Sequence, residues 1–266
     1  MKEQIISALS PQYPWKDRFH FWEETDSTND QLKIMARQGF PHGTVLIADR
    51  QSGGHGRMGR SFHSPGGMGI YFSILLRPQC SPKDLMHLTC ATAVAMCDAV
   101  QAAAGFRPGI KWTNDLVYQK RKLGGILTEL GLGAKGTVDY AIIGIGINCC
   151  QQEEDFAPEI RGIAASLAMV TGRTIDRAKV AAAMMDALFR MDQILLPQKA
   201  DLLNRYRRNC ITIGQEISLL RVGEAVRHGR AVDMDDAGAL IVEFSDGSVE
   251  TVNSGEVSVR GMYGYL

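Results

Sequence analysis

The sequence predicts an α/β protein whose sheet is flanked by helices up to about residue 210, followed by a small β-barrel of about 50 residues. Two long stretches, 123–132 and 138–148, have the pattern of strands and are almost continuously apolar, as central strands are. A long apolar helix pattern at 81–104 provides a layer to cover the sheet. Beyond about residue 210, short strand patterns separated by turns are typical of a barrel.

Length and composition fit a soluble globular protein. The chain has 266 residues, of which 45% are hydrophobic and 22% charged, enough for one large domain and a small one. Lys plus Arg equals Asp plus Glu, at 29 each, so the overall charge gives no indication of nucleic-acid binding.

Cysteine usage and hydropathy predict a cytoplasmic protein. The six cysteines include no CxxC pair and no Cys/His ligand spacing, which indicates free thiols in a reducing compartment. We expect no signal peptide, since the N-terminus has too little apolar content. We expect no membrane span either, because no run of about 18 apolar residues occurs.

The N-terminal half alternates strands and helices after a short lead-in. A helix is expected from Asp26 or Ser27, either of which can cap it, to about Gln38, where Gly39 ends it. A second helix begins at Ser81 and Pro82, because proline suits the first helical position. Strands are expected at 19–23, 44–49 and 70–76.

The second half completes the sheet and then changes character. Strands are expected at 110–112, 116–118, 123–132 and 138–148, and helices at 162–170, 177–196 and 200–209. The barrel strands are expected at 213–220, 225–234, 239–244, 248–252 and 257–260.

A glycine-rich loop follows the strand at 44–49. Its four glycines within 51–60 allow positive φ and bring backbone N–H groups close to a ligand. Arg57 and Arg60 lie in the same loop. Such N–H groups and guanidinium forks suit phosphate or carboxylate oxygens.

A second polar stretch covers 111–115 and 121–127. It brings Lys111 and Lys122 near the pair Asn114–Asp115, so cations accompany a carboxylate that is a candidate magnesium ligand. Joining a carboxylate to the α-phosphate of ATP needs this set of groups, because both reactants are anionic and repel each other.

Five motifs in order carry a resemblance to a known family. They are Ser27–Thr28–Asn29, then Gln51 with the glycine loop, Lys111–Trp112–x–Asn114–Asp115, Lys122–Leu123–x–Gly125–Ile126–Leu127, and Gly144–Ile145–Gly146–Ile147–Asn148. Together, from about Trp22 to the C-terminus, they closely resemble the biotin protein ligases. That resemblance implies ATP-dependent attachment of biotin to a lysine of the biotin carboxyl carrier protein.

The resemblance also implies a fold. The expected architecture is a mixed central sheet flanked by helices, of the class II synthetase type, with a small SH3-like C-terminal barrel. The division would be a catalytic biotin- and ATP-binding domain over 1–210 and a barrel domain over 211–266. A homodimer is common in the family, so it is a further expectation.

Roles carry over residue by residue, with biotin and ATP as substrates and Mg²⁺ as the metal. The catalytic set implied is Lys122, Arg57, Asp115 and Lys111, with Asp115 as the magnesium ligand or as a base. The biotin set implied is Ser27, Thr28, Asn29, Gln51, Gly54, His55, Gly56, Arg57, Tyr71, Lys122, Gly125, Leu127 and Gly144. The ATP set implied is Arg57, Arg60, Phe62, Asn114, Lys122, Ile147 and Asn148.

Three residues depart from the family pattern. His55 stands where arginine is usual, Thr113 where proline is usual, and Phe62 where some members have the tryptophan that stacks on adenine. Phe62 can still stack. His55 removes a permanent positive charge from the loop, because imidazole is only partly protonated near neutral pH.

Simpler interpretations and rival functions stay open at this point. Ser27 and Asp30 fit a helix cap, the glycine loop fits a plain turn, and Lys120–Arg121–Lys122 fits a solvated hairpin tip. The rival functions are lipoate ligation on a related fold and a non-catalytic biotin sensor. DNA binding is not expected, because about 18 residues precede the first strand, too few for a three-helix DNA-binding module.

Overall fold

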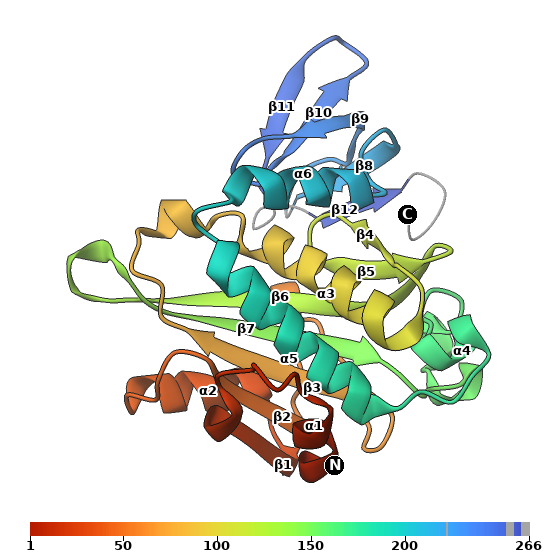
Figure 1. The fold of residues 1–266 in the computed structure, drawn as a ribbon. Helices are drawn as coiled ribbons and strands as arrows, with labels where there is room; N and C mark the ends of the chain where they lie inside the picture. The colour runs from red at the N-terminus through yellow and green to blue at the C-terminus, as the bar shows by residue number, and fades with distance from the viewer. Residues whose placement is uncertain (222, 254–257, 262–266) are drawn as a thin grey trace.

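The computed structural model describes residues 1–221, 223–253 and 258–261, and its main element is a seven-stranded sheet (Figure 1). The strand order is β1-β2-β3-β7-β6-β5-β4. β1 pairs in parallel with β2 and the other pairs are antiparallel, so the predicted mixed sheet is confirmed. The strands are β1 (Phe19–Thr25), β2 (Thr44–Gln51), β3 (Gly69–Leu76), β4 (Gly109–Lys111), β5 (Asp115–Tyr118), β6 (Arg121–Leu132) and β7 (Val138–Asn148).

Helices cover both faces of this sheet, which is why its central strands are apolar on both sides. α2 (Thr28–Arg37) packs against Leu46, Leu75 and Ile142 on one face. α3 (Leu88–Ala104), α5 (Arg177–Ile194) and α6 (Lys199–Asn209) cover the other face. Every residue of β3 is buried. The short helices α1 (Lys2–Ala8) and α4 (Leu167–Thr171) lie at the periphery, α1 against α5.

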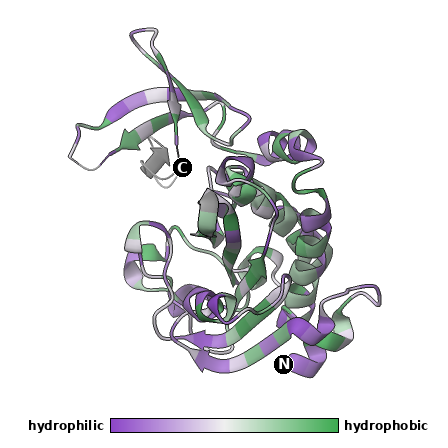
Figure 2. Cartoon of the chain, turned by 90° about the vertical axis from the view of Figure 1, so that its left-hand side faces the viewer, coloured by the Kyte–Doolittle hydropathy of each residue, from purple (hydrophilic) through white to green (hydrophobic). Residues whose placement is uncertain are grey.

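The segment Pro82–Ala104 is the one described helix with the length and hydropathy of a membrane span. Most of it is buried inside the protein, under α5 and α6. In Figure 2 the hydrophobic colour gathers on these inner helices and on the sheet beneath them. The apolar composition of Pro82–Ala104 is therefore that of a core helix.

The C-terminal strands form a second antiparallel sheet, in the order β11-β10-β9-β8-β12. The predicted strands are found, although β8 begins at Glu216, and Val257 lies outside the described residues. Within the described part of the chain β11 and β12 remain unpaired with each other, so the expected barrel is seen as an open sheet. The strands are β8 (Glu216–Leu220), β9 (Arg227–Met234), β10 (Leu240–Phe244), β11 (Val249–Val252) and β12 (Ser258–Gly261).

The two sheets are joined by buried contacts. The Trp112 indole N–H donates to the carbonyl of Gly238 at 2.9 Å, and Arg207 donates to the carbonyl of Met234 at 2.7 Å. Inner residues of β8, β9 and β10 belong to the same apolar cluster as α3.

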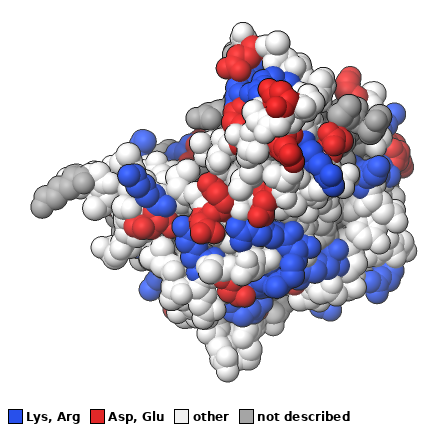
Figure 3. Space-filling model, turned by 90° about the horizontal axis from the view of Figure 1, so that it is seen from above, with Lys and Arg blue, Asp and Glu red and all other residues white. Residues whose placement is uncertain are grey.

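The surface seen from above carries both positive and negative side chains. Lys and Arg form a band on this face, with Asp and Glu beside them (Figure 3).

Two helix predictions need correction. The helix expected from Ser81 starts as a short 3-10 turn, Pro82–Leu85, and α3 begins only at Leu88. The helix expected at 162–170 is wrong in its first half. The Lys122 N–H donates to the carbonyl of Ile163 at 2.7 Å and the Ala165 N–H to the carbonyl of Lys122 at 2.8 Å. These residues pair with β6 instead, and α4 starts after the capping residue Ser166.

The C-terminal sheet should depend on pH through Glu250. The hydrogen bond from Arg221 lowers the pKa of Glu250, and Arg227, at 2.6 Å, adds to the shift. We expect Glu250→Gln to lower the free energy of unfolding by about 1 kcal/mol at pH 7. The wild-type advantage is complete above the ordinary Glu pKa, about 4.3, and is lost as the pH falls through the lower folded-state pKa.

Urea unfolding of both proteins between pH 7 and pH 3 measures this difference. Glu243→Gln, at an exposed position of β10, is the matched control and should show a much smaller gap. A gap for Glu250→Gln that stays constant down to pH 3 would contradict the assignment.

Candidate active site

One large cavity, of about 650 Å³, lies where the five predicted motifs meet. It contains all but three of the predicted site residues. These are Ser27, Thr28, Asn29, Gln51, His55, Gly56, Arg57, Arg60, Phe62, Lys111, Asn114, Asp115, Lys122, Gly125, Leu127, Gly144 and Asn148. Register explains the convergence, since Asp115 pairs with Gly125 and Gly125 with Gly146 across three adjacent strands.

Gly54, Tyr71 and Ile147 do not line the cavity. Tyr71 corrects the expectation of a cavity-wall tyrosine: it is buried, donates its hydroxyl to the carbonyl of Pro65 at 2.8 Å and meets the Phe62 ring edge-on. Its side chain therefore supports the glycine loop from behind. Ile147 is part of the main apolar core.

One end of the cavity, which we call the polar pole, consists of a hydrogen-bond network between α2 and the sheet. The N–H and the hydroxyl of Thr28 donate to Gln51 Oε1 at 2.9 and 3.0 Å. Gln51 Nε2 donates to Ser64 Oγ at 3.1 Å. Ser73 Oγ lies 2.7 Å from Thr28 Oγ1 and 2.6 Å from Asn29 Oδ1. The network holds these polar side chains in fixed orientations.

Ser73 and Glu129 are members of the polar pole that the sequence did not reveal. Asn29 Nδ2 donates to Glu129 Oε2 at 2.8 Å, and Glu129 Oε1 pairs with Lys33 at 2.7 Å. The amide of Asn29 is thus fixed from both sides. An i, i+4 spacing of Asn29 and Lys33 on one helix face is the sequence signal for a shared acidic partner, but it does not say which carboxylate.

Two glycines of β7 leave the room that the cavity needs. A Cβ on Gly144 would lie 2.2 Å from Asn29 Oδ1, and one on Gly146 would lie 2.4 Å from the Phe62 ring. Their spacing of two places both on the same face of the strand. The Phe62 ring therefore lies directly against β7 at Gly146, where a side chain would displace it.

The middle of the cavity carries the charges, and we call it the charge centre. Lys122 Nζ lies 2.7 Å from Asp115 Oδ1, and Arg57 donates to Asn114 Oδ1 at 2.9 Å, which links the glycine loop to the second motif. A bulge at Leu123, where β6 has one extra residue opposite β5, turns Lys122 to the same side as Asp115.

Burial shapes the electrostatics of the charge centre. It lowers the pKa of Arg57 from its ordinary value, and the carboxylate of Asp115 opposes that shift. A guanidinium remains protonated at neutral pH all the same. Lys111 is buried at 7% exposure, so a third cationic side chain borders the same space.

The other end, the distal pole, is mostly apolar and was largely missed by the sequence analysis. It is formed by Phe156, Ile160, Ile163 and Ala164, together with Asn148 and Gln151. Because 163–165 pair with Lys122, this segment closes the cavity beyond the end of β7. Single apolar residues in an otherwise charged stretch, 152–163, were the available signal.

The glycine loop is held at both ends. At its start, Gly53 N–H donates to the carbonyl of Asp26 at 2.8 Å. At its far end Gly67 N–H donates to Asp49, and Arg177 on α5 holds Asp49 at 2.8 Å. Within the loop, Phe62 N–H donates to the carbonyl of Gly54 at 2.8 Å. The glycine loop is therefore anchored by more hydrogen bonds than a plain turn requires.

The simpler interpretations of the motifs, as a helix cap, a plain turn and a hairpin tip, were right in part. Ser27 does cap α2, accepting from Asp30 N–H at 3.4 Å, and it also borders the cavity. The Trp112–Thr113 peptide bond is cis, at the position where the resemblance places a proline. Lys122 does not lie at a solvated tip, because it pairs with Asp115.

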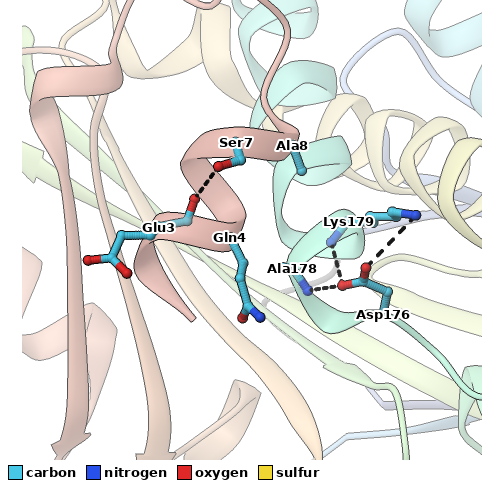
Figure 4. Close-up of a pocket in the computed structure, with 7 residues that line it drawn as sticks. All are labelled: Glu3, Gln4, Ser7, Ala8, Asp176, Ala178 and Lys179. Atoms are coloured by element: carbon cyan, nitrogen blue, oxygen red, sulfur yellow. Dashed lines mark hydrogen bonds and ion pairs between the residues drawn. The ribbon is translucent and has the colours of Figure 1, made fainter.

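A second cavity lies between α1 and α5 and carries no comparable chemistry (Figure 4). It measures about 430 Å³. Its hydrogen bonds are local ones: Ser7 donates to the carbonyl of Glu3 at 2.8 Å, and Asp176 caps α5 through Ala178 and Lys179. We therefore place the active site in the larger cavity.

Magnesium fits the larger cavity only together with a nucleotide. Asp115 is the single carboxylate among the described residues that line it, and no group of three or more His, Cys, Asp or Glu gathers anywhere in the described chain. Mg²⁺ usually keeps waters and binds through one or two carboxylates plus substrate phosphates. Asp115 would hold the ion, which would supply positive charge beside the phosphates.

Comparison with known proteins decides the family. The profile described as "Biotin/lipoate A/B protein ligase family" matches residues 21–148, and "Biotin protein ligase C terminal domain" matches 212–260. The chain is 35% identical to the bifunctional ligase/repressor BirA of Bacillus spizizenii, over 88% of this chain and 71% of that protein. It belongs to the biotin protein ligase family.

Other relatives agree. The biotin–acetyl-CoA-carboxylase ligase of Paracoccus denitrificans is 30% identical over 89% of this chain and 98% of its own length. The structure of the biotin protein ligase from Aquifex aeolicus in complex with biotin and ATP matches with a TM-score of 0.76 at 30% identity, over 91% of this chain and 98% of that one. The predicted resemblance and enzyme class are therefore confirmed.

The close approach at Gly144 gives a test of the polar pole. Gly144→Ala should displace Asn29 and raise the KM for biotin about tenfold or more, because a methyl group and a fixed, buried amide cannot share the space. The KM for ATP should change far less. Steady-state pyrophosphate release with each substrate varied measures both constants.

Gly162→Ala is the control, because a Cβ there meets nothing within 4 Å. Thermal unfolding confirms that both variants are folded. A folded Gly144→Ala with an unchanged KM for biotin would show that Asn29 has no part in binding it.

Proposed function

We propose that this protein activates biotin with ATP as biotinyl-5′-adenylate and transfers the biotinyl group to a lysine of a biotin carboxyl carrier protein. One observation supports this above all. A single cavity contains the polar pole, the charge centre and the mostly apolar distal pole, one after the other along its length. This order suits biotin, the reacting anions and a nucleotide base.

In the first half-reaction, an oxygen of the biotin carboxylate attacks the α-phosphorus of ATP and pyrophosphate leaves. Both reactants are negative, so the barrier includes their repulsion. Lys122, Arg57 and Arg60 provide positive charge at the cavity. The ion pair of Lys122 with Asp115 and the hydrogen bond of Arg57 to Asn114 hold the first two in place before the substrates arrive. Preorganised donors of this kind contribute about 3 kcal/mol each.

In the second half-reaction, the acceptor lysine's amine attacks the acyl carbon of the mixed anhydride and AMP leaves. The amine has to lose a proton, and Asp115 is the one carboxylate among the described cavity residues. We assign Asp115 either this task or the binding of Mg²⁺ with the nucleotide. The anchored glycine loop, with Arg57 fixed on Asn114, would shield the adenylate from water.

The expectations about localisation, oligomeric state, DNA binding and domain division stay predictions. Cytoplasmic localisation is supported by the six free cysteines. We retain the homodimer, the lack of DNA binding and the division into domains at about residue 210, where α6 ends.

Lipoate ligation is the nearest rival, because the matching family profile covers both acids. The polar pole favours biotin. Thr28, Asn29 and Gln51 line the cavity and are held in fixed orientations, so their polar groups suit a ureido ring, whereas a dithiolane needs an apolar slot. Competition between the two acids during adenylation separates these functions.

Transfer of labelled biotin to a purified carrier domain tests the whole proposal. Label should become covalently bound only when MgATP is present, and AMP and pyrophosphate should appear in equal amounts. Biotin binding without pyrophosphate release would instead identify a sensor, and transfer of lipoate in preference to biotin would identify the rival ligase.

Lys122→Ala should lower biotin-dependent pyrophosphate release by about 100- to 1,000-fold, because a charge that stabilises the transition state is lost. Lys120→Ala removes an exposed cation two residues away and is the matched control. Circular dichroism checks that both variants fold. Near-normal release by Lys122→Ala would exclude Lys122 from the chemistry.

Arg57→Ala should release biotinyl-adenylate into solution about 10- to 100-fold faster, because a charge-assisted hydrogen bond to the anion and the link to Asn114 are both lost. Single-turnover reactions without acceptor, followed by rapid filtration, measure the escape rate. Arg50→Ala, at an exposed residue of β2, is the control. If Arg57→Ala and wild type released the adenylate at equal rates, the glycine loop would not be what retains it in the cavity.

A further inference from the structure

Gln151 presents a buried acceptor that has no donor. It lies three residues beyond β7, is 2% exposed and borders the cavity at the distal pole. Its Oε1 has no hydrogen-bond partner among residues 1–221, 223–253 and 258–261. An acceptor buried in this way destabilises the folded protein, and such groups are rare in native structures. A ligand that supplies a donor would remove this cost.

A short relay fixes which way the Gln151 amide points. Asn148 Nδ2 donates to the carbonyl of Ala165 at 3.1 Å, and Gln151 Nε2 donates to Asn148 Oδ1 at 3.4 Å. A backbone carbonyl can only accept, so Asn148 must present Nδ2 to it and Oδ1 to Gln151. Turning the Gln151 amide over would set two oxygens against each other. Oε1 is therefore held as an acceptor.

The position of Gln151 indicates which part of a substrate it meets. Gly144 marks the polar pole, and Asn148 lies four residues further along β7, about 13 Å away at the usual rise of a strand. The charge centre lies between them. With the carboxylate and α-phosphate at the charge centre and biotin at the polar pole, the nucleotide base is directed to the distal pole, among Phe156, Ile160 and Ile163.

We propose that Gln151 is a base-specificity residue, whose Oε1 accepts a hydrogen bond from the exocyclic amino group of adenine. This rests on the proposed function, because it takes ATP as the nucleotide. The 6-amino group is the one donor on the edge of adenine. Guanine and hypoxanthine have a carbonyl oxygen in that place, which would face the fixed Oε1 and be repelled.

Nucleotide analogues test the assignment on the unmodified protein. ATP, purine riboside triphosphate, which lacks the 6-amino group, and inosine triphosphate are compared by calorimetric binding and by biotin-dependent pyrophosphate release. We expect both analogues to bind roughly 10- to 100-fold more weakly than ATP, the effect of one buried hydrogen bond. Equal binding of ATP and purine riboside triphosphate would overturn the proposal.

Gln151→Met keeps the size of the side chain and removes the acceptor. ATP should then bind roughly 10- to 100-fold more weakly, and the preference for ATP over purine riboside triphosphate should fall to near one. The KM for biotin should not change. Gln152→Met, at the exposed neighbouring glutamine, should keep the wild-type preference. Full preference retained by Gln151→Met would also overturn the assignment.

The two readouts keep this proposal separate from the proposed function. If the wild-type protein binds ATP with the expected preference but releases no pyrophosphate with biotin, ligase activity fails and the role of Gln151 stands. If pyrophosphate is released equally well from both nucleotides, the ligase function stands and the role of Gln151 fails. Should Gln151→Met not fold, the wild-type analogue comparison decides by itself.

Discussion

The repulsion between two negative reactants is the constraint on which the active site depends. Cations have to be present before the substrates, and cations beside a buried sheet are costly unless they are paired. Lys122 is paired with Asp115, and Arg57 is hydrogen-bonded to Asn114. Both partners come from one short segment, so the β5 strand and the turn before it orient one cation of β6 and one of the glycine loop. Positioning these charges is the main electrostatic task of the fold.

Room for the substrates comes from the sheet itself. A sheet face with helices on it is normally filled by side chains. Here Gly144 and Gly146 in β7 and Gly125 in β6 lower one patch of that face, with Asn29 and Phe62 resting on β7. The result is a groove along a strand, and its direction sets the order of the polar pole, charge centre and distal pole.

Much of this could be predicted from the sequence, because the motifs lie at the ends of strands whose apolar patterns are strong. Asp115, Gly125 and Gly146 then meet by register. What could not be predicted depends on pairs distant in the chain. Periodicity alone made 162–165 helical, yet Lys122 pairs with these residues, so the distal pole was missed. Tyr71 was expected in the wall, but the arrangement of Phe62 over Gly146 leaves it behind the loop.

The two poles differ in how completely their polar groups are satisfied. At the polar pole, Thr28, Gln51, Asn29 and Ser73 bond to one another and to the sheet, so their positions do not depend on a ligand. At the distal pole, the relay from Ala165 through Asn148 ends at Gln151 Oε1, an acceptor to which no residue in the described part of the chain donates. A pole of the first kind selects by shape and prearranged hydrogen bonds. A pole of the second kind gains its missing bond on binding, so with the role assigned to Gln151 the nucleotide would stabilise the folded protein as well as take part in the reaction.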